Sequence, residues 1–142
     1  MSYLLDTNVV SELRKGRGSD PNVRAWYDST QGSTKYLSSL VIGELTRGVH
    51  QLSKRDVPQA TRLAAWLTGI KEHYASRIVP VDTATAIIWG RWQAASPMPV
   101  ADGLMAATAY LNDWTFVTRN VKDVERTGVR TLNPFEPMAT SS

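Results

Sequence analysis

The first twelve residues restrict the folds open to this chain more than any other stretch. An apolar run at residues 3–5 stops at three polar residues, Asp6, Thr7 and Asn8, and apolar side chains then recur at helical spacing. This pattern predicts a short buried strand that ends at Asp6 and is followed at once by a helix. Asp6 is then a helix cap, or a functional carboxylate at the carboxyl end of a strand. The two roles are compatible.

Short apolar runs and helical periodicities alternate through the rest of the chain. Further extended segments are expected at residues 35–38, 78–81, 114–118 and 129–132. Helices are expected between them, including one that places Ala60, Leu63, Leu67 and Ile70 on one stripe. This alternation predicts an α/β domain with a mostly parallel sheet. We expect one domain over residues 1–135, followed by a flexible, Pro- and Ser-containing tail at residues 136–142.

Composition limits the cellular compartment and the kinds of partner expected for the protein. The chain has 142 residues and no cysteine, so it can form neither disulfides nor thiolate metal sites, which suits the cytoplasm. No apolar run approaches the roughly 18–20 residues that span a bilayer, and no signal peptide is recognisable. The net charge of +3 is low and spread along the chain, so it gives little support for a nucleic-acid partner by itself. We therefore expect a cytoplasmic protein without a membrane partner.

Four acidic residues lie at predicted element boundaries or on apolar helices: Asp6, Glu44, Asp102 and Asp123. Each has an ordinary explanation, because Asp102 suits a helix N-terminus, Glu44 could be a surface residue and Asp123 could pair with a nearby arginine. Together they suggest one shared acidic site. In a parallel sheet the ends of the first and fourth strands open on the same edge, and the following helices begin there.

Converging carboxylates need a counterion. Two such charges about 4 Å apart repel by about 4 kcal/mol at an effective dielectric constant near 20. Mg²⁺ and Mn²⁺ prefer oxygen ligands, so a site built from Asp and Glu, without Cys or His, suits either of them.

Four short segments carry a resemblance to a known family. They are residues 4–8 (Leu-Leu-Asp-Thr-Asn), 39–45 (Ser-Leu-Val-Ile-Gly-Glu-Leu), 101–103 (Ala-Asp-Gly) and 117–123 (Val-Thr-Arg-Asn-Val-Lys-Asp). In this order, and over roughly residues 3–135, they resemble the PIN-domain ribonucleases. Among these the chain is most similar to the VapC-type toxins of bacterial type II toxin–antitoxin systems.

The resemblance implies a fold, a cofactor and a set of site residues. The fold is a three-layer α/β/α domain with a central, mostly parallel sheet of four to five strands, and the cofactor is Mg²⁺ or Mn²⁺. By position, Asp6, Glu44 and Asp102 would be the metal ligands. Asn120 falls at a fourth position where some members have Asp, and Asp123 could share that role through water. Thr7, Asn8 and Thr118 would be supporting polar groups.

The resemblance also implies an activity and partners. The activity is hydrolysis of phosphodiester bonds in RNA, in tRNA or ribosomal RNA. The partners are a small VapB-type antitoxin and a second copy of the chain, in a homodimer or a higher-order toxin–antitoxin complex. We expect an antitoxin arginine to reach the carboxylates, and an antitoxin segment to follow a groove lined by the early helices. The candidate contacts are Trp26, Tyr27, Leu45 and Val49.

Other readings remain open. A degenerate PIN-like module would bind RNA or a partner without cleaving. A phosphatase with an Asp nucleophile usually has a second Asp two residues on, where this chain has Asn8. Cleavage through the 2′-hydroxyl would need histidines, and His50 and His73 lie outside the four motifs.

Overall fold

The computed structural model describes residues 1–138 and contains one fully parallel sheet within them. The last residues of the predicted tail, 139–142, lie outside the described residues. The strands are β1 (Ser2–Leu5), β2 (Thr34–Ser38), β3 (Ile78–Val79), β4 (Thr115–Val117) and β5 (Thr131–Leu132), in the spatial order β3-β2-β1-β4-β5. The predicted α/β class with a parallel sheet is confirmed.

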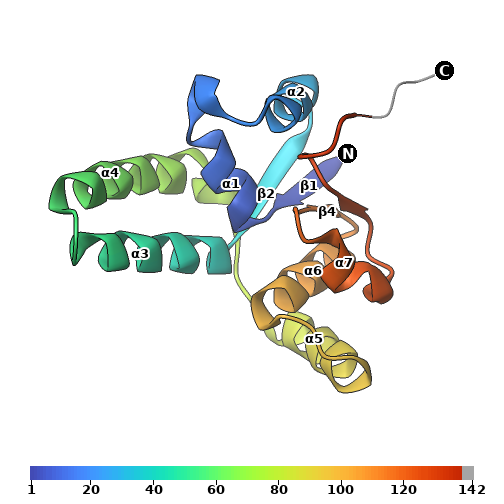
Figure 1. The fold of residues 1–142 in the computed structure, drawn as a ribbon. Helices are drawn as coiled ribbons and strands as arrows, with labels where there is room; N and C mark the ends of the chain where they lie inside the picture. The colour runs from blue at the N-terminus through green and yellow to red at the C-terminus, as the bar shows by residue number, and fades with distance from the viewer. Residues whose placement is uncertain (139–142) are drawn as a thin grey trace.

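Helices lie on both sides of this sheet (Figure 1). They are α1 (Thr7–Leu13), α2 (Pro21–Ser29), α3 (Ser39–Ser53), α4 (Val57–His73), α5 (Thr83–Ala95), α6 (Val100–Asn112) and α7 (Val121–Val124). The α3–α4 pair extends to one side of the molecule, while α5 and α6 form a second pair near α7. None of the described helices combines the length and apolarity needed to cross a bilayer.

The central strand is β1, which pairs with β2 on one side and β4 on the other. Because both faces of a central parallel strand are covered, Leu4 and Leu5 are fully buried in the core. The chain fills the sheet outward from β1 through β2 and β3, and then returns to the opposite side with β4 and β5. The strand order therefore reverses between β1 and β4, the point at which α/β sheets bind ligands beyond the strand ends.

The edge strands β3 and β5 are shorter than the four-residue runs expected from the sequence. Pro80 follows β3 directly and has no N–H to donate to a neighbouring strand, which limits β3 to two residues. The other predicted strands and helices are present with small shifts at their ends.

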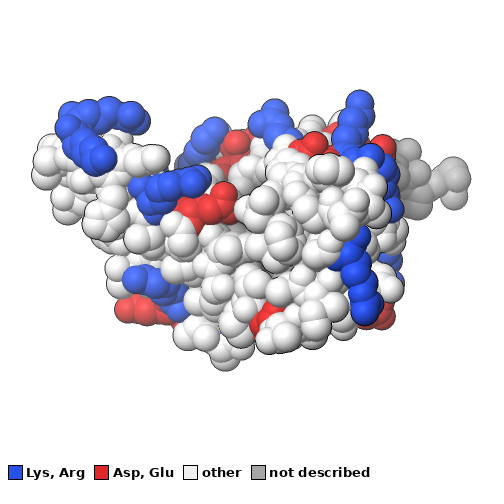
Figure 2. Space-filling view, turned by 90° about the horizontal axis from the view of Figure 1, so that it is seen from below, with Lys and Arg blue, Asp and Glu red and all other residues white. Residues whose placement is uncertain are grey.

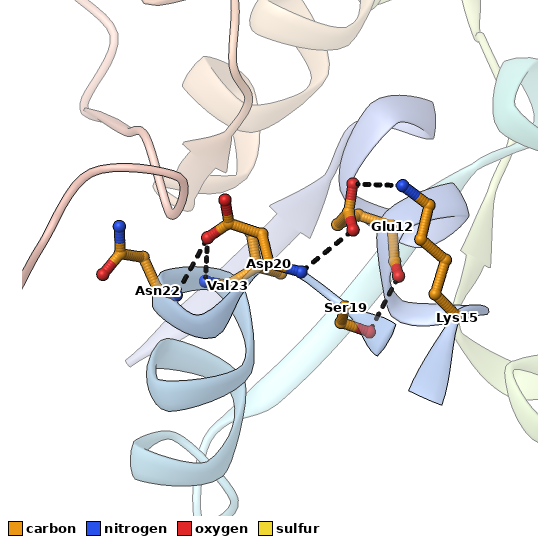
Figure 3. A network of polar contacts seen from close by, with 6 residues as sticks. All are labelled: Glu12, Lys15, Ser19, Asp20, Asn22 and Val23. Atoms are coloured by element: carbon orange, nitrogen blue, oxygen red, sulfur yellow. Dashed lines mark hydrogen bonds and ion pairs between the residues drawn. The ribbon is translucent and has the colours of Figure 1, made fainter. Parts of the chain in front are cut away.

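A polar network fixes α2 against the end of α1 (Figure 3). The Glu12 carboxylate accepts from the backbone N–H of Asp20 at 3.0 Å and from Lys15 Nζ at 3.1 Å, and the Asp20 N–H holds the Glu12 pKa below its ordinary value. Asp20 Oδ1 in turn accepts from the N–H groups of Asn22 and Val23, which caps α2 as its sequence predicts. The connection between the first two helices is thus held by side chains at both ends.

Candidate active site

Asp6 ends β1 and is at once a cap and the centre of a polar cluster. Its Oδ1 accepts from the backbone N–H of Thr7 at 2.7 Å and so caps α1. Its Oδ2 accepts from Thr118 Oγ1 at 2.7 Å and from Asn8 Nδ2 at 3.3 Å. With 3% of its surface exposed, Asp6 is held rigidly at the carboxyl end of the central strand.

Glu44 reaches the same edge from α3, which begins directly after β2. Ser38 caps that helix through the N–H of Leu40, so the start of α3 lies beside the end of β1. Thr7 Oγ1 donates to Glu44 Oε1 at 2.8 Å and links the first two motifs across 37 residues of sequence. Glu44 is half-buried rather than an exposed surface residue.

Asp102 approaches the cluster from the first turn of α6. Burial, reinforced by the charges of Asp6, Asp123 and Glu44, raises the pKa of Asp102 to about 6, and a hydrogen bond from Asn120 opposes this rise. Burial also raises the pKa of Asp6, with a further contribution from Glu44. The carboxylates are therefore close enough to repel one another.

The loop after β4 completes the cluster. Thr118 Oγ1 donates to Asp6 and accepts from the backbone N–H of Asn120 at 3.0 Å, so one hydroxyl joins β1 to this loop. The backbone N–H of Arg119 donates to Asn8 Oδ1 at 3.4 Å. The eight residues predicted for the active site thus lie at one edge of the sheet: Asp6, Thr7, Asn8, Glu44, Asp102, Thr118, Asn120 and Asp123.

The chemistry of this cluster fits a hard divalent cation. Its donors are carboxylate, hydroxyl and amide oxygens, and among residues 1–138 no lysine or arginine forms an ion pair with Asp6, Glu44 or Asp102. Over the same range, no three acidic or histidine side chains stand in a ready-made ligand arrangement. Binding an ion would therefore require the carboxylates to rotate toward it, and the ion would relieve the mutual repulsion that adds to burial in raising the pKa values of Asp6 and Asp102.

Gly103 is a residue whose role the sequence analysis missed. A Cβ atom at this position would lie 2.9 Å from Cδ1 of Trp89 and 3.1 Å from Cγ and Sδ of Met98. The absence of a side chain therefore lets the start of α6, with Asp102, pack closely on α5. A glycine inside a helix, where it is unfavourable, was the available signal.

Gly103→Ala is expected to destabilise the fold and to displace Asp102. Overpacking against the Trp89 ring costs about 1–3 kcal/mol, while the better helix propensity of alanine returns at most about 1 kcal/mol. Chemical denaturation should show a lower free energy of unfolding. Gly69→Ala in α4 is the matched control, because open space surrounds that position, and it should be neutral or stabilising. A Gly103→Ala protein as stable as the Gly69→Ala protein would contradict this account.

A parallel α/β domain with a carboxylate cluster at its topological switch point defines a class of acidic, cation-binding domains. Within that class, a model of the PIN domain matches residues 3–128, and the chain belongs to the PIN-domain family.

Relatives agree with this assignment along nearly the whole chain. The VapC ribonuclease Y4jK of Sinorhizobium fredii is 32% identical over 141 residues, which cover 94% of this chain and 98% of the relative. The toxin FitB of Neisseria gonorrhoeae is 32% identical, covering 93% and 97%. Among solved structures, FitAcB from Neisseria gonorrhoeae has 31% identity and a TM-score of 0.80, covering 94% of this chain and 98% of that one.

Proposed function

We propose that this protein is the toxin of a type II toxin–antitoxin system, a Mg²⁺- or Mn²⁺-dependent endoribonuclease that acts in the cytoplasm on tRNA or ribosomal RNA. The observation that carries the proposal is the convergence of Asp6, Glu44 and Asp102 at the ends of β1 and β4, with no cationic side chain paired to them among residues 1–138. The relatives named VapC ribonuclease and FitB toxin support it.

The chain's own residues position and orient the reacting groups. Asp6, Glu44 and Asp102 would hold the cation, which when bound supplies activation of a water molecule and stabilisation of the charge on the phosphate. Thr7 and Thr118 each donate a hydrogen bond to a carboxylate and hold it in place. Asn120, beside Asp102, or Asp123, whose charge raises the Asp102 pKa, would fill the fourth position.

The decisive experiment is cleavage of total RNA by the purified protein with added Mg²⁺ or Mn²⁺, compared with the same reaction in EDTA. We expect cleavage only with the metal. Attack by water leaves a 5′-phosphate and a 3′-hydroxyl, whereas attack by the 2′-hydroxyl leaves a cyclic phosphate. We expect the former ends, and the variants His50→Ala and His73→Ala should cleave normally, because both histidines lie in α3 and α4 away from the carboxylate cluster.

Two results would contradict the proposal. Full activity in EDTA, or cyclic phosphate on the products, would show another mechanism. RNA that is bound but left intact in Mg²⁺ and Mn²⁺ would instead identify a PIN module that has lost catalysis.

Cation binding should depend on pH in the range where Asp102 titrates. The pKa of Asp102 is raised to about 6, so protons compete with the ion below that pH and are absent above it. Affinity for Mn²⁺, measured by calorimetry, should fall about tenfold or more from about pH 7.5 to about pH 5. An affinity that stays constant across this range would show that Asp102 is not a ligand.

An antitoxin is the proposed protein partner, as in the FitAB complex to which this chain is similar. A cavity of about 250 Å³ lies between α1, α2 and α4 and is lined by Val10, Tyr27 and Trp66, among others. Two of the antitoxin contacts predicted from the sequence are wrong, because their side chains are buried and cannot line such a surface. Trp26 is 3% exposed and packs edge-to-face on Tyr3, and Leu45 is 7% exposed in the core. Tyr27 remains a candidate contact.

A second copy of the chain is the other proposed partner. Ile87 on α5 and Val100, Tyr110 and Leu111 on α6 are large apolar residues with 43–54% of their surface exposed. Figure 2 views the molecule from the side of α5 and shows a broad area without charged side chains. A largely apolar face can pack against a second copy of itself, so α5 and α6 are the surface we assign to a homodimer.

A further inference from the structure

A second cavity adjoins the carboxylate cluster and is not explained by cation binding. It measures about 300 Å³ and lies where the loop after β4 meets the segment after β5. Its wall includes Arg119, Lys122 and Asn133, together with Glu136. Asn120 and Asp123 also line it, so the cavity shares two residues with the proposed active site.

Arg119 is an exposed cation whose side chain is nevertheless held in place. Its guanidinium carbon lies 4.4 Å from the centre of the Phe135 ring. The Phe135 segment is itself anchored, because Asn22 Nδ2 donates to the Phe135 carbonyl at 2.9 Å and the Phe135 N–H donates to Asn133 Oδ1 at 3.0 Å. The ring therefore fixes the guanidinium at the cavity with less loss of conformational entropy when a ligand binds.

The two cations of this cavity are not neutralised by contact with its acids. Asp123 and Glu136 line the same space, but no ion pair within residues 1–138 joins either of them to Arg119 or Lys122. A bound anion would thus meet two cations with free donor groups. A planar guanidinium matches phosphate oxygens in a bidentate geometry, and a lysine adds a point charge.

We propose that this cavity binds the RNA phosphate next to the one that is cleaved, through Arg119 and Lys122. The proposal rests on the proposed function and adds to it a substrate-positioning site. Arg119 directly precedes Asn120, whose backbone N–H donates to Thr118 Oγ1 in the carboxylate cluster, and the Cα atoms of the two residues lie about 3.8 Å apart. An RNA strand that crosses the carboxylate cluster therefore passes within reach of the Arg119 side chain.

The shared wall favours RNA over an acidic peptide as the occupant. In RNA the phosphates on either side of the cleaved bond belong to the same backbone, so a strand bound at the carboxylate cluster also places a charged phosphate next to this cavity. A peptide would bring separate carboxylates to Arg119 and Lys122, whereas RNA carries a phosphate at every nucleotide, including the one next to the phosphate that is cleaved.

The test uses the full chain with Asp102→Asn, so that RNA is bound and not cut. Binding of a labelled single-stranded oligoribonucleotide is followed by fluorescence anisotropy at several salt concentrations, with and without Arg119→Ala or Lys122→Ala. We expect Arg119→Ala to weaken binding about tenfold and Lys122→Ala to weaken it less. Each substitution should also lower the salt slope, the slope of log affinity against log salt concentration, by about one. Arg119→Lys should keep the salt slope and recover only part of the affinity.

Arg62→Ala is the matched control, since it removes one exposed positive charge from α4 and should leave affinity and slope nearly unchanged. If Arg119→Ala lowers the melting temperature of the protein, its weaker RNA binding could come from a damaged fold, and the RNA affinity of Lys122→Ala then decides the result. Unchanged affinity and slope in both variants, or losses no larger than that of Arg62→Ala, would overturn the proposal even if the wild type cleaves RNA. Weakened antitoxin binding with normal RNA binding would overturn it too. A wild type that neither binds nor cleaves RNA would overturn the proposed function as well.

Discussion

Asp6→Asn and Asp102→Asn are each expected to reduce RNA cleavage at least about 100-fold, measured as the initial rate on a defined RNA in Mg²⁺ or Mn²⁺. Substitutions that only reorient a metal ligand already cost about 10–100-fold, and here the ligand oxygen itself is replaced by an amide. Asp6 should be the more sensitive position, because it sits between Thr118, Asn8 and the backbone of Thr7.

The loss should not come from unfolding. The pKa of Asp102 is raised in the folded protein from 3.8 to about 6, so the folded state binds protons more tightly than the unfolded chain. The stability this confers is present below about pH 4 and is lost as the pH rises through about 6. Asp102→Asn removes this loss, so in EDTA at neutral pH the variant should melt at a higher temperature than the wild type. The difference should vanish below about pH 4.

The matched control is Asp113→Asn. Asp113 is exposed, lies at the opposite end of α6 from Asp102, and has a left-handed backbone with φ of 59° that asparagine tolerates. This variant should cleave RNA at the wild-type rate. Asp6→Asn or Asp102→Asn proteins that retain full activity would refute the assignment of these carboxylates.

Expression of this protein alone in a bacterial host is expected to arrest growth, and co-expression of its antitoxin should restore it. An acidic pocket that cuts cellular RNA is harmful unless it is blocked. An antitoxin arginine could block it through charge-assisted hydrogen bonds to Asp6, Glu44 or Asp102, in space that the cation or phosphate needs. Growth curves after induction measure both effects.

The Asp6→Asn variant separates catalysis from partner binding. It should be harmless when expressed alone yet still bind the antitoxin, because the cavity between α1, α2 and α4 would supply most of the contact area. Co-purification measures that binding. A fully toxic Asp6→Asn protein, or a wild type that is harmless without antitoxin, would contradict this account of the pocket.

The local features of the site were predictable because they depend on neighbouring residues. The apolar run before Asp6 and the polar residues after it predict a strand end, a cap and a helix, and all three are present. Asp20 caps α2 and Ser38 caps α3 for the same reason, since side-chain oxygens satisfy the free N–H groups of a first turn. The α/β class follows from the alternation of these local patterns.

Only the tertiary structure decided which distant residues meet. Asp6 and Thr118 are 112 positions apart, and their hydrogen bond exists because β1 pairs with β4, a strand order that no local pattern encodes. Burial of Trp26 and the close packing at Gly103 depend in the same way on neighbours brought from elsewhere in the chain. The sequence by itself thus determined the elements, their caps and the acidic residue types. The sheet order decided their convergence, because pairing between strands is a long-range interaction.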